Sequence, residues 1–275
     1  YKRREIQPDY LVRTAAFTAM SKHRIIGSLA MATCCLALSA CGQWTSAQSV
    51  PTTQVITTTT TEPEVISASG QRSGVATKAA QKKLLSLGFW LLTPNGKYDE
   101  TTRQAVMAFQ KYYQLRPTGS MNDATAFLLD KLEVRPQAQA MEGTLAEVDK
   151  ERQLLFLVEE GVTKYVINAS TGDDRPYVEP DMNTPGVLIR GTAITPVGKF
   201  KTNRERPDGW WVGDLGQIYR PKYFIGGVAI HGSQVVPAYP ASHGCVRVTT
   251  AAMDMIWDSG LMPLGSDVVV YGELN

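Results

Sequence analysis

The chain has 275 residues, of which 43% are hydrophobic and 20% are charged, so it can bury a core and hold one large or two modest globular domains. Its net charge is only +2, divided as +7 in residues 1–140 and −5 in residues 141–275. Neither half has a run of basic residues with interleaved aromatic side chains, so nothing in the composition supports nucleic-acid binding.

A secretory signal is predicted close to the N-terminus. In the segment MSKHRIIGSLAMATCCLALSAC, which begins at Met20, basic residues precede an apolar run over residues 25–38, and small residues follow it. The apolar run is too short to span a bilayer comfortably as a mature helix, so the segment predicts export. Residues 1–19 fit no export signal, and we exclude them from the fold prediction.

The end of this signal resembles a bacterial lipobox, with the sequence Leu-Ser-Ala-Cys over residues 38–41. The resemblance implies that Cys41 is lipidated and becomes the N-terminus of an exported protein in the cell envelope, anchored to the outer face of the cytoplasmic membrane. An ordinary cleaved signal, with Cys41 left free or released nearby, is the alternative.

Cysteine usage singles out one thiol. Of the four cysteines, Cys34 and Cys35 leave with the predicted signal and Cys41 would carry lipid, so Cys245 is the one thiol left in the mature chain. An odd cysteine in an exported protein indicates either intermolecular pairing or a reactive thiol.

A disordered tether is predicted over residues 42–74, which are rich in Thr, Ser, Gln and Pro and contain little that can form a core. As a flexible chain, about 33 residues average roughly 30 Å from end to end. Such a tether would let a membrane-anchored domain reach outward into a surface polymer.

A small helical domain is predicted over residues 75–138, where apolar residues recur at helical spacing in segments separated by Gly, Pro and Asn. A Gly turn that leads to Asp99 recurs 23 residues later, where it leads to Asn122. Both side chains are suited to accept hydrogen bonds from the free amides at a helix start. The two similar units predict a three-helix domain.

This helical segment resembles the peptidoglycan-binding domain of the PG_binding_1 type, through Ala105-Val106, Phe109-Gln110 and Leu115. The resemblance implies that the domain holds the chain on cell-wall glycan. A helical spacer without affinity is the alternative, because a fold does not fix a function.

From residue 143 to residue 275 the sequence predicts a mainly β domain, because the hydrophobic period switches to two. Only residues 250–259, which follow the last cysteine, have a helical pattern. The predicted strands are 144–149, 152–160, 163–171 and 266–272.

The residues that carry chemistry gather near the C-terminus. His231 and His243, the two histidines left after the signal, both lie within 15 residues of Cys245. A thiol is largely protonated at neutral pH, so a cysteine nucleophile needs a neighbouring base or cation. The spacing lets the His231 segment end one strand and the Cys245 segment begin another beside it. Gly232 and Gly244 would let backbone approach the reacting centre, and successive amides near Cys245 can bind a developing oxyanion.

Two other interpretations of this cluster remain open. In one, Cys245 is a buried structural cysteine and the histidines are incidental. In the other, His231, His243 and Cys245 bind a metal ion, although this set offers only three ligands and two of them lie two residues apart on a predicted strand.

The same residues resemble the signature of a known family. IHGS at 230–233 followed by SHGCVRV at 242–248 resembles the L,D-transpeptidase signature of the YkuD type. STG at 170–172 and TPVGKF at 195–200 match further motifs of that family. The resemblance covers about residues 143–272.

The resemblance implies a β-sandwich-like catalytic fold and an acyl transfer that uses no cofactor and no metal. Cys245 would attack the carbonyl between the L-centre of a diamino acid and the terminal D-Ala of a tetrapeptide stem, with His231 as general base. Backbone amides around His243, Gly244 and Cys245 would form the oxyanion hole. The residues implied to shape the substrate pocket are Ser242, His243, Arg247, Gly232 and Ser233.

Release of D-Ala would leave an acyl-enzyme, which the side-chain amine of another stem would resolve as a 3→3 crosslink. With water in place of the amine the chain would be an L,D-carboxypeptidase, and with an inert Cys245 it would be a non-catalytic wall-binding lipoprotein. The implied partners are stem tetrapeptides as donor and acceptor, cell-wall glycan and the membrane.

Three departures from the family pattern affect the site. Only ten residues separate His231 from Ser242, so the lid-like loop 233–241 is expected to shape acceptor access differently. The extra segment 173–194 predicts either a second flap, whose aromatic and acidic residues meet a cationic acceptor amine, or a solvated loop. Gly232 follows the base where some members have Ser, so a backbone carbonyl is expected to orient the base.

Overall fold

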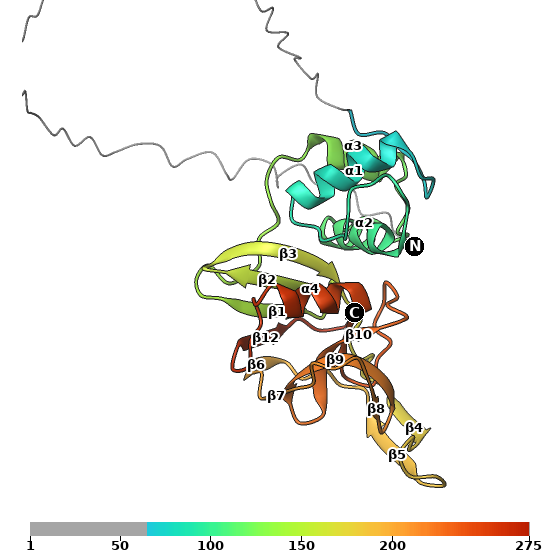
Figure 1. Cartoon of the computed structure of the whole chain (residues 1–275), viewed down its shortest axis with the longest axis vertical. Helices are drawn as coiled ribbons and strands as arrows, with labels where there is room; N and C mark the ends of the chain where they lie inside the picture. Colours follow the sequence, from blue (N-terminus) through green and yellow to red (C-terminus); the bar gives the residue numbers. More distant parts are fainter. Residues whose placement is uncertain (1–64, 275) are drawn as a thin grey trace, which may run out of the picture. The chain divides into compact units, whose positions relative to one another are not determined.

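The computed structural model describes residues 65–274 of the chain (Figure 1). The predicted signal, the lipidation at Cys41 and the tether up to residue 64 lie outside the described residues. None of the helices among residues 65–274 is long and apolar enough to cross a membrane.

The first part of the described chain is a domain of three helices, as predicted. Asp99 accepts the N–H of Thr102 at 2.8 Å, and Asn122 accepts the N–H of Thr125 at 2.9 Å. Each side chain thus satisfies one of the amides that a helix start leaves without a partner, which confirms the two predicted caps. The helices are α1 (Val75–Ser86), α2 (Glu100–Tyr112) and α3 (Asp123–Lys131).

A pair of buried glutamines extends the internal echo of this domain. The side-chain oxygen of Gln81 in α1 accepts the N–H of Gly96 at 2.7 Å, and that of Gln110 in α2 accepts the N–H of Gly119 at 2.8 Å. Both glutamine side chains are fully buried, so their amides must find partners inside the protein. Each glutamine therefore fixes the Gly turn that leads to the next helix.

The residues before α1 pack onto this domain. The side chain of Ile66 is buried, and its N–H donates to the carboxylate of Asp130 at 3.0 Å. Gly70 exchanges two backbone hydrogen bonds with Met121, at 3.0 and 2.9 Å. The prediction of a disordered tether up to residue 74 is therefore wrong for its last residues, because Ile66 finds an apolar surface that the local composition does not reveal.

The second part of the chain is a sandwich of two β-sheets with one short helix, α4 (Thr250–Asp258), which confirms the predicted fold class. One sheet has the order β3 (Val162–Asn168), β2 (Leu154–Glu159), β1 (Leu145–Asp149), β12 (Asp267–Tyr271) and β6 (Gly198–Lys201). The other has the order β11 (Val246–Thr249), β10 (Val228–Ser233), β9 (Gly216–Ile225) and β7 (Arg204–Glu205), with β8 (Trp210–Gly213) also paired to β9. A separate hairpin is formed by β4 (Pro176–Pro180) and β5 (Leu188–Thr192), and it extends in the same direction as β8 (Figure 1).

Strand β2 is buried on both faces. Leu155 and Leu157 belong to the core between the two sheets, whereas Leu154 and Phe156 belong to the core that contains α1 and α2. Double burial explains why this strand is a continuous apolar run and does not alternate with polar residues. The outer face of β2 and the helical domain therefore share one buried core, which is separate from the core between the two sheets.

Two polar side chains of α2 also reach into the sandwich. Lys111 is buried, and its ammonium group donates to the carbonyls of Gln153 at 3.0 Å and Ala169 at 3.1 Å. Burial lowers the pKa of Lys111 to about 7. Gln104 donates to the carbonyl of Val236 at 2.9 Å, and the side-chain amide of Asn168 donates to the Gln104 oxygen.

These contacts fasten the loop 234–241, which joins β10 to the cysteine segment. The Val236 side chain is buried, and the hydroxyl of Ser170 donates to the carbonyl of Tyr239 at 2.8 Å. At the end of the loop, the N–H of Ala241 donates to the carbonyl of Thr171 at 2.9 Å. A helix of the first domain and the segment after β3 thus hold the loop together.

Replacing Gln104 by Ala should loosen the loop 234–241 without unfolding the chain. The change removes the side-chain donor of the Val236 carbonyl and the acceptor of the Asn168 amide, so we expect to lose about 1–3 kcal/mol of stability and to gain faster amide exchange in the loop. Hydrogen exchange followed by mass spectrometry measures the second effect.

Gln110→Ala is the matched control, because Gln110 lies in the same helix, is buried, and bonds only within the helical domain. It should lower stability and leave the exchange of the loop unchanged. Loop exchange in Gln104→Ala that equals that of the unsubstituted protein would contradict the role assigned to Gln104.

Candidate active site

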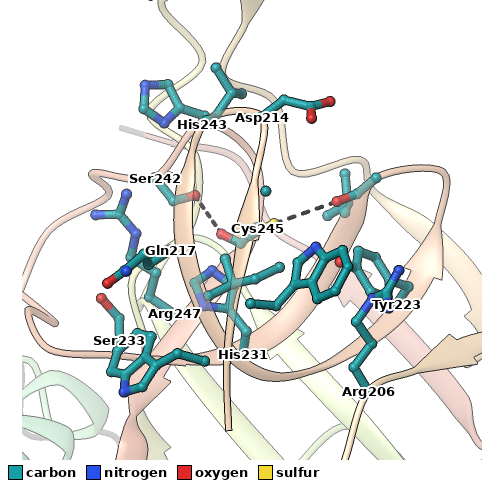
Figure 2. Close-up of a pocket in the computed structure, with 18 of the residues that line it drawn as sticks. Arg206, Asp214, Gln217, Tyr223, His231, Ser233, Ser242, His243, Cys245 and Arg247 are labelled. Carbon is teal, nitrogen blue, oxygen red and sulfur yellow. Dashed lines mark hydrogen bonds between the residues drawn. The ribbon is translucent and has the colours of Figure 1, made fainter. Parts of the chain in front are cut away.

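The structure brings His231 and Cys245 to neighbouring strands. β10 and β11 pair in parallel, with His231 opposite Arg247, and Cys245 lies directly before β11. This confirms that the two motif segments lie side by side. Both residues border one cavity of about 730 Å³, a size typical of small-molecule sites (Figure 2).

Cys245 is a half-buried thiol at the wall of this cavity. Its sulfur accepts the N–H of Ala229 at 3.4 Å and lies 3.7 Å from the carbonyl of Gly227, to which the thiol donates. Burial raises the pKa of Cys245, because desolvation penalises the thiolate. At neutral pH the group is therefore a thiol.

His231 is held as a neutral base. Its Nδ1 lies 2.8 Å from the carbonyl of Gly232, which can only accept, so Nδ1 carries the proton and Nε2 keeps its lone pair. Burial lowers the pKa of His231 to about 4. The contact confirms that a backbone carbonyl orients the imidazole of His231. Within residues 65–274, no hydrogen bond joins the thiol to the imidazole. The raised pKa of Cys245 and the lowered pKa of His231 favour a resting pair without charge.

The cysteine loop, residues 242–245, is closed by the hydroxyl of Ser242. That oxygen accepts the N–H of Gly244 at 3.0 Å and donates to the carbonyl of Cys245. The expectation that Gly244 supplies an oxyanion-hole amide needs correction, because its N–H is already bonded. The amides of His243 and Cys245 have no acceptor among the residues that the structure describes.

Glycine is required at position 244 for packing. Its φ is +133°, and a Cβ there would lie 2.7 Å from the carbonyl oxygen of Ile194. At Gly232 a Cβ would lie 2.9 Å from the ring of Tyr219 and 3.0 Å from the Cα of Thr250. Both glycines thus allow close approach to protein neighbours, whereas the sequence suggested approach to the reacting centre.

The two upstream motifs hold the cysteine loop through hydrogen bonds. Ser170 exchanges backbone hydrogen bonds with Arg247 at 3.0 and 2.9 Å, and the carbonyl of Thr171 accepts the N–H of Ser242 at 3.0 Å. The hydroxyl of Thr195 accepts the N–H of Gly172 at 2.9 Å and donates to the Gly244 carbonyl at 2.7 Å. STG and the start of TPVGKF are therefore scaffold for the thiol.

Of the five predicted pocket residues, all but Gly232 border the cavity, and Gly244 of the predicted oxyanion hole does not border it either. The polar groups of the residues that do border it differ in availability. The hydroxyl of Ser233 donates to the carbonyl of Val235 at 3.1 Å, so Ser233 closes a turn. Arg247 forms no ion pair with a carboxylate of residues 65–274, and burial lowers the pKa of its guanidinium.

The segment 173–194 forms the β4–β5 hairpin and packs against the site. The ring of Tyr177 contacts that of His243 edge to face, with 4.8 Å between centroids, and the carboxylate of Glu179 lies 3.8 Å from its Nε2. At the tip, the side-chain amide of Asn183 donates to the carboxylate of Asp214 at 2.8 Å. The segment is thus a hairpin tied to the β8–β9 turn, and most residues of its two strands are exposed.

Sequence reasoning missed one wall of the cavity. Arg204, Arg206, Trp210 and Trp211 come from β7, β8 and the segment between them, and all four border the cavity. A signal exists in NRERPDGWWVG, where two arginines and an adjacent tryptophan pair flank a turn. It does not by itself reveal that this segment lies beside Cys245.

The metal-site interpretation has no ligand set in the described part of the chain. No three side chains of His, Cys, Asp or Glu come together there in a group that could hold a metal ion. His243 faces Tyr177 and Glu179, while the Nδ1 of His231 is taken by a carbonyl.

Comparisons with known proteins show the family to which the chain is similar. A family model described as an L,D-transpeptidase catalytic domain matches residues 143–270, and one described as a putative peptidoglycan binding domain matches residues 73–129. The chain is similar to the crystal structure of an L,D-transpeptidase from Xylanimonas cellulosilytica, with 41% identity and a TM-score of 0.65 over 72% of this chain and 94% of that one. An L,D-transpeptidase from Stackebrandtia nassauensis matches with 20% identity and a TM-score of 0.41 over 76% and 95% of the two chains. No curated protein sequence matches the chain.

The pH dependence of thiol alkylation tests the neutral pair. Because burial raises the pKa of Cys245 and lowers that of His231 to about 4, the thiolate should form only at high pH. Modification of Cys245 by iodoacetamide, followed by peptide mass spectrometry, should rise in one step centred above about pH 8.5, the usual cysteine value.

A short unstructured peptide that contains one cysteine is the reference for this measurement. A further step in the Cys245 profile, between about pH 4 and 7, would reveal a thiolate paired with an imidazolium and would contradict the neutral pair.

Proposed function

Because the chain belongs to the L,D-transpeptidase family, we propose that it forms 3→3 crosslinks between peptidoglycan stems through an acyl-enzyme on Cys245. The observation that carries this proposal is the position of Cys245 and His231 on neighbouring parallel strands at the wall of one cavity. The tautomer of His231, with its proton on Nδ1, leaves Nε2 free to accept the thiol proton.

In the first step, Cys245 Sγ attacks the carbonyl carbon that links the L-centre of the diamino acid to the terminal D-Ala, and His231 Nε2 takes the thiol proton. The oxyanion that forms is bound by the free amides of His243 and Cys245. The bond to the D-Ala nitrogen then breaks, and the imidazolium returns the proton to that nitrogen. D-Ala leaves, and a thioester remains on Cys245.

In the second step, the side-chain amine of another stem attacks the thioester carbonyl. His231 takes a proton from the attacking amine and returns it to the sulfur as the thioester bond breaks, which restores the thiol and releases the crosslinked product. Hydrolysis by water through the same steps would give a tripeptide and make the protein an L,D-carboxypeptidase.

A neutral resting pair suits this sequence of steps. A buried thiolate and imidazolium would each lose solvation before substrate arrives. With both groups neutral, charge develops only as the oxyanion meets its amide donors, so the donors stabilise the transition state more than the resting site.

We further propose that the protein works in the cell envelope after export. The predicted signal and the lipobox-like residues 38–41 support export and a lipid anchor at Cys41. The helical domain, which matches a putative peptidoglycan binding family, would hold the sandwich on its polymer substrate.

Incubation of residues 42–275 with purified disaccharide-tetrapeptide tests the proposed reaction. Mass spectrometry should detect a crosslinked dimer that has lost one D-Ala, and Cys245→Ala should give none because it lacks the nucleophile. Tripeptide alone would replace transpeptidation by hydrolysis, and unchanged substrate would favour a non-catalytic wall-binding protein.

Replacing His231 by Gln should lower kcat/KM for D-Ala release by about 10²–10⁴-fold, since the thiol then has no positioned base. Binding of the tetrapeptide, measured calorimetrically, should stay unchanged because His231 contributes to proton transfer. Full activity in this variant would remove His231 from the mechanism.

A further inference from the structure

Two arginines on the cavity wall lie over aromatic rings. The guanidinium of Arg204 lies 3.9 Å from the ring centroid of Tyr223, and that of Arg206 lies 3.6 Å from the ring centroid of Trp211. In Figure 2, Arg206 and Tyr223 lie together on one side of Cys245. Stacking fixes the plane of a guanidinium and leaves its N–H donors at the edge of the ring.

Arg206 makes no polar contact with its side chain in the described part of the protein. Its Nε is buried and has no hydrogen-bond partner, and no carboxylate of residues 65–274 forms an ion pair with it. Other arginines of the sandwich are paired, since Arg152 lies 2.6 Å from Asp149 and Arg220 lies 2.7 Å from Asp254. Arg206 borders the cavity, and its side-chain donors have no acceptor among residues 65–274. The site therefore favours a ligand that supplies an acceptor.

The charge of the cavity wall favours an anion. Its lining includes Arg204, Arg206 and Arg247 but only one carboxylate, that of Asp214, which already accepts the amide of Asn183. An excess of cationic groups within a concave wall concentrates the field on an anionic ligand. A planar carboxylate has two oxygens that match the paired donors of a guanidinium. A point charge does not match them.

We propose that Arg206, with Arg204 beside it, binds a carboxylate of the donor stem peptide. This inference rests on the proposed function, because it takes the stem peptide as the ligand of the cavity. Arg206 is a positioning residue: by holding a carboxylate at a fixed place on the wall, it sets which carbonyl of the stem lies against Cys245. Stems in which that carboxylate is an amide should then be poor donors.

Equilibrium binding to the Cys245→Ala protein tests the subsite without turnover. The ligands are disaccharide-tetrapeptide, the same compound with its C-terminal carboxylate converted to a carboxamide, and a third with its internal carboxyl groups amidated. Arg206→Gln, added to Cys245→Ala, should weaken binding of the unmodified ligand by about 10-fold or more, the usual loss for a charge-assisted hydrogen bond.

Amidation of the carboxylate that Arg206 binds should weaken binding to the Cys245→Ala protein, in which Arg206 is unchanged, by a similar factor. Adding Arg206→Gln should then not weaken the binding of that amidated ligand any further. Which of the two amidated ligands behaves in this way identifies the carboxylate. Arg206→Lys keeps the charge and loses the planar pair of donors, so its affinity for the unmodified ligand should lie between that of the protein with Arg206 and that of Arg206→Gln. Arg190→Gln, in the exposed strand β5, is the control and should bind like Cys245→Ala alone.

Unchanged affinity for the unmodified ligand in Arg206→Gln would overturn the subsite and leave the proposed function standing. So would an Arg206→Gln loss that is the same for all three ligands, because it would mean a purely structural contact with Trp211. If Arg206→Gln fails to fold, the comparison of the three ligands on Cys245→Ala decides alone: equal affinities overturn the subsite. No binding of tetrapeptide to Cys245→Ala would overturn the proposed function together with the subsite.

Discussion

The segment 168–172 is the constraint on which the active site depends. The carbonyl of Thr171 holds the N–H of Ser242 at the start of the cysteine loop. From the other side, the buried ammonium of Lys111 donates to the carbonyl of Ala169. Cys245, the proposed nucleophile, is therefore positioned by backbone groups whose own partners are fixed, and substrate binding need not order the loop again. The same segment would be mobile without the helix that carries Lys111, because its carbonyls would lack their buried donor.

Burial determines the charge states of Cys245 and His231, and so the chemistry that the site permits. It raises the pKa of Cys245 and lowers that of His231 to about 4, so both groups are neutral where an ordinary cysteine–histidine site would hold an ion pair. A base with so low a pKa is weak, yet it is always free to accept a proton at physiological pH. The cost of a weak base is offset if the oxyanion forms next to the unpaired amides of His243 and Cys245, since charge is then stabilised only where it develops.

Local patterns in the sequence predicted those features of the fold and the site that depend only on residues close together in the chain. Asp99 and Asn122 cap helices because a cap needs only the next three residues. The pairing of the His231 strand with the Cys245 segment was also predicted, because both motifs are short and lie close together in the sequence. What depends on distant contacts was missed. The N–H of Gly244 is bonded because the Ser242 hydroxyl lies within reach, and the side chain of Arg206 is open because no residue in the described range 65–274 supplies it with an acceptor. No local sequence pattern encodes either arrangement.

The helical domain has a structural consequence for the site that a separate wall-binding module would not have. Gln104 of α2 bonds to the carbonyl of Val236, and the neighbouring residues Gln234 and Val235 border the cavity. β2 completes the connection by burying Phe156 against the helices. Because these contacts are buried, any shift of α2 must either break a hydrogen bond or move the loop. A force transmitted from polymer to the helical domain would therefore reach the rim of the cavity, so that the proposed attachment and the proposed catalysis would depend on the same buried contacts.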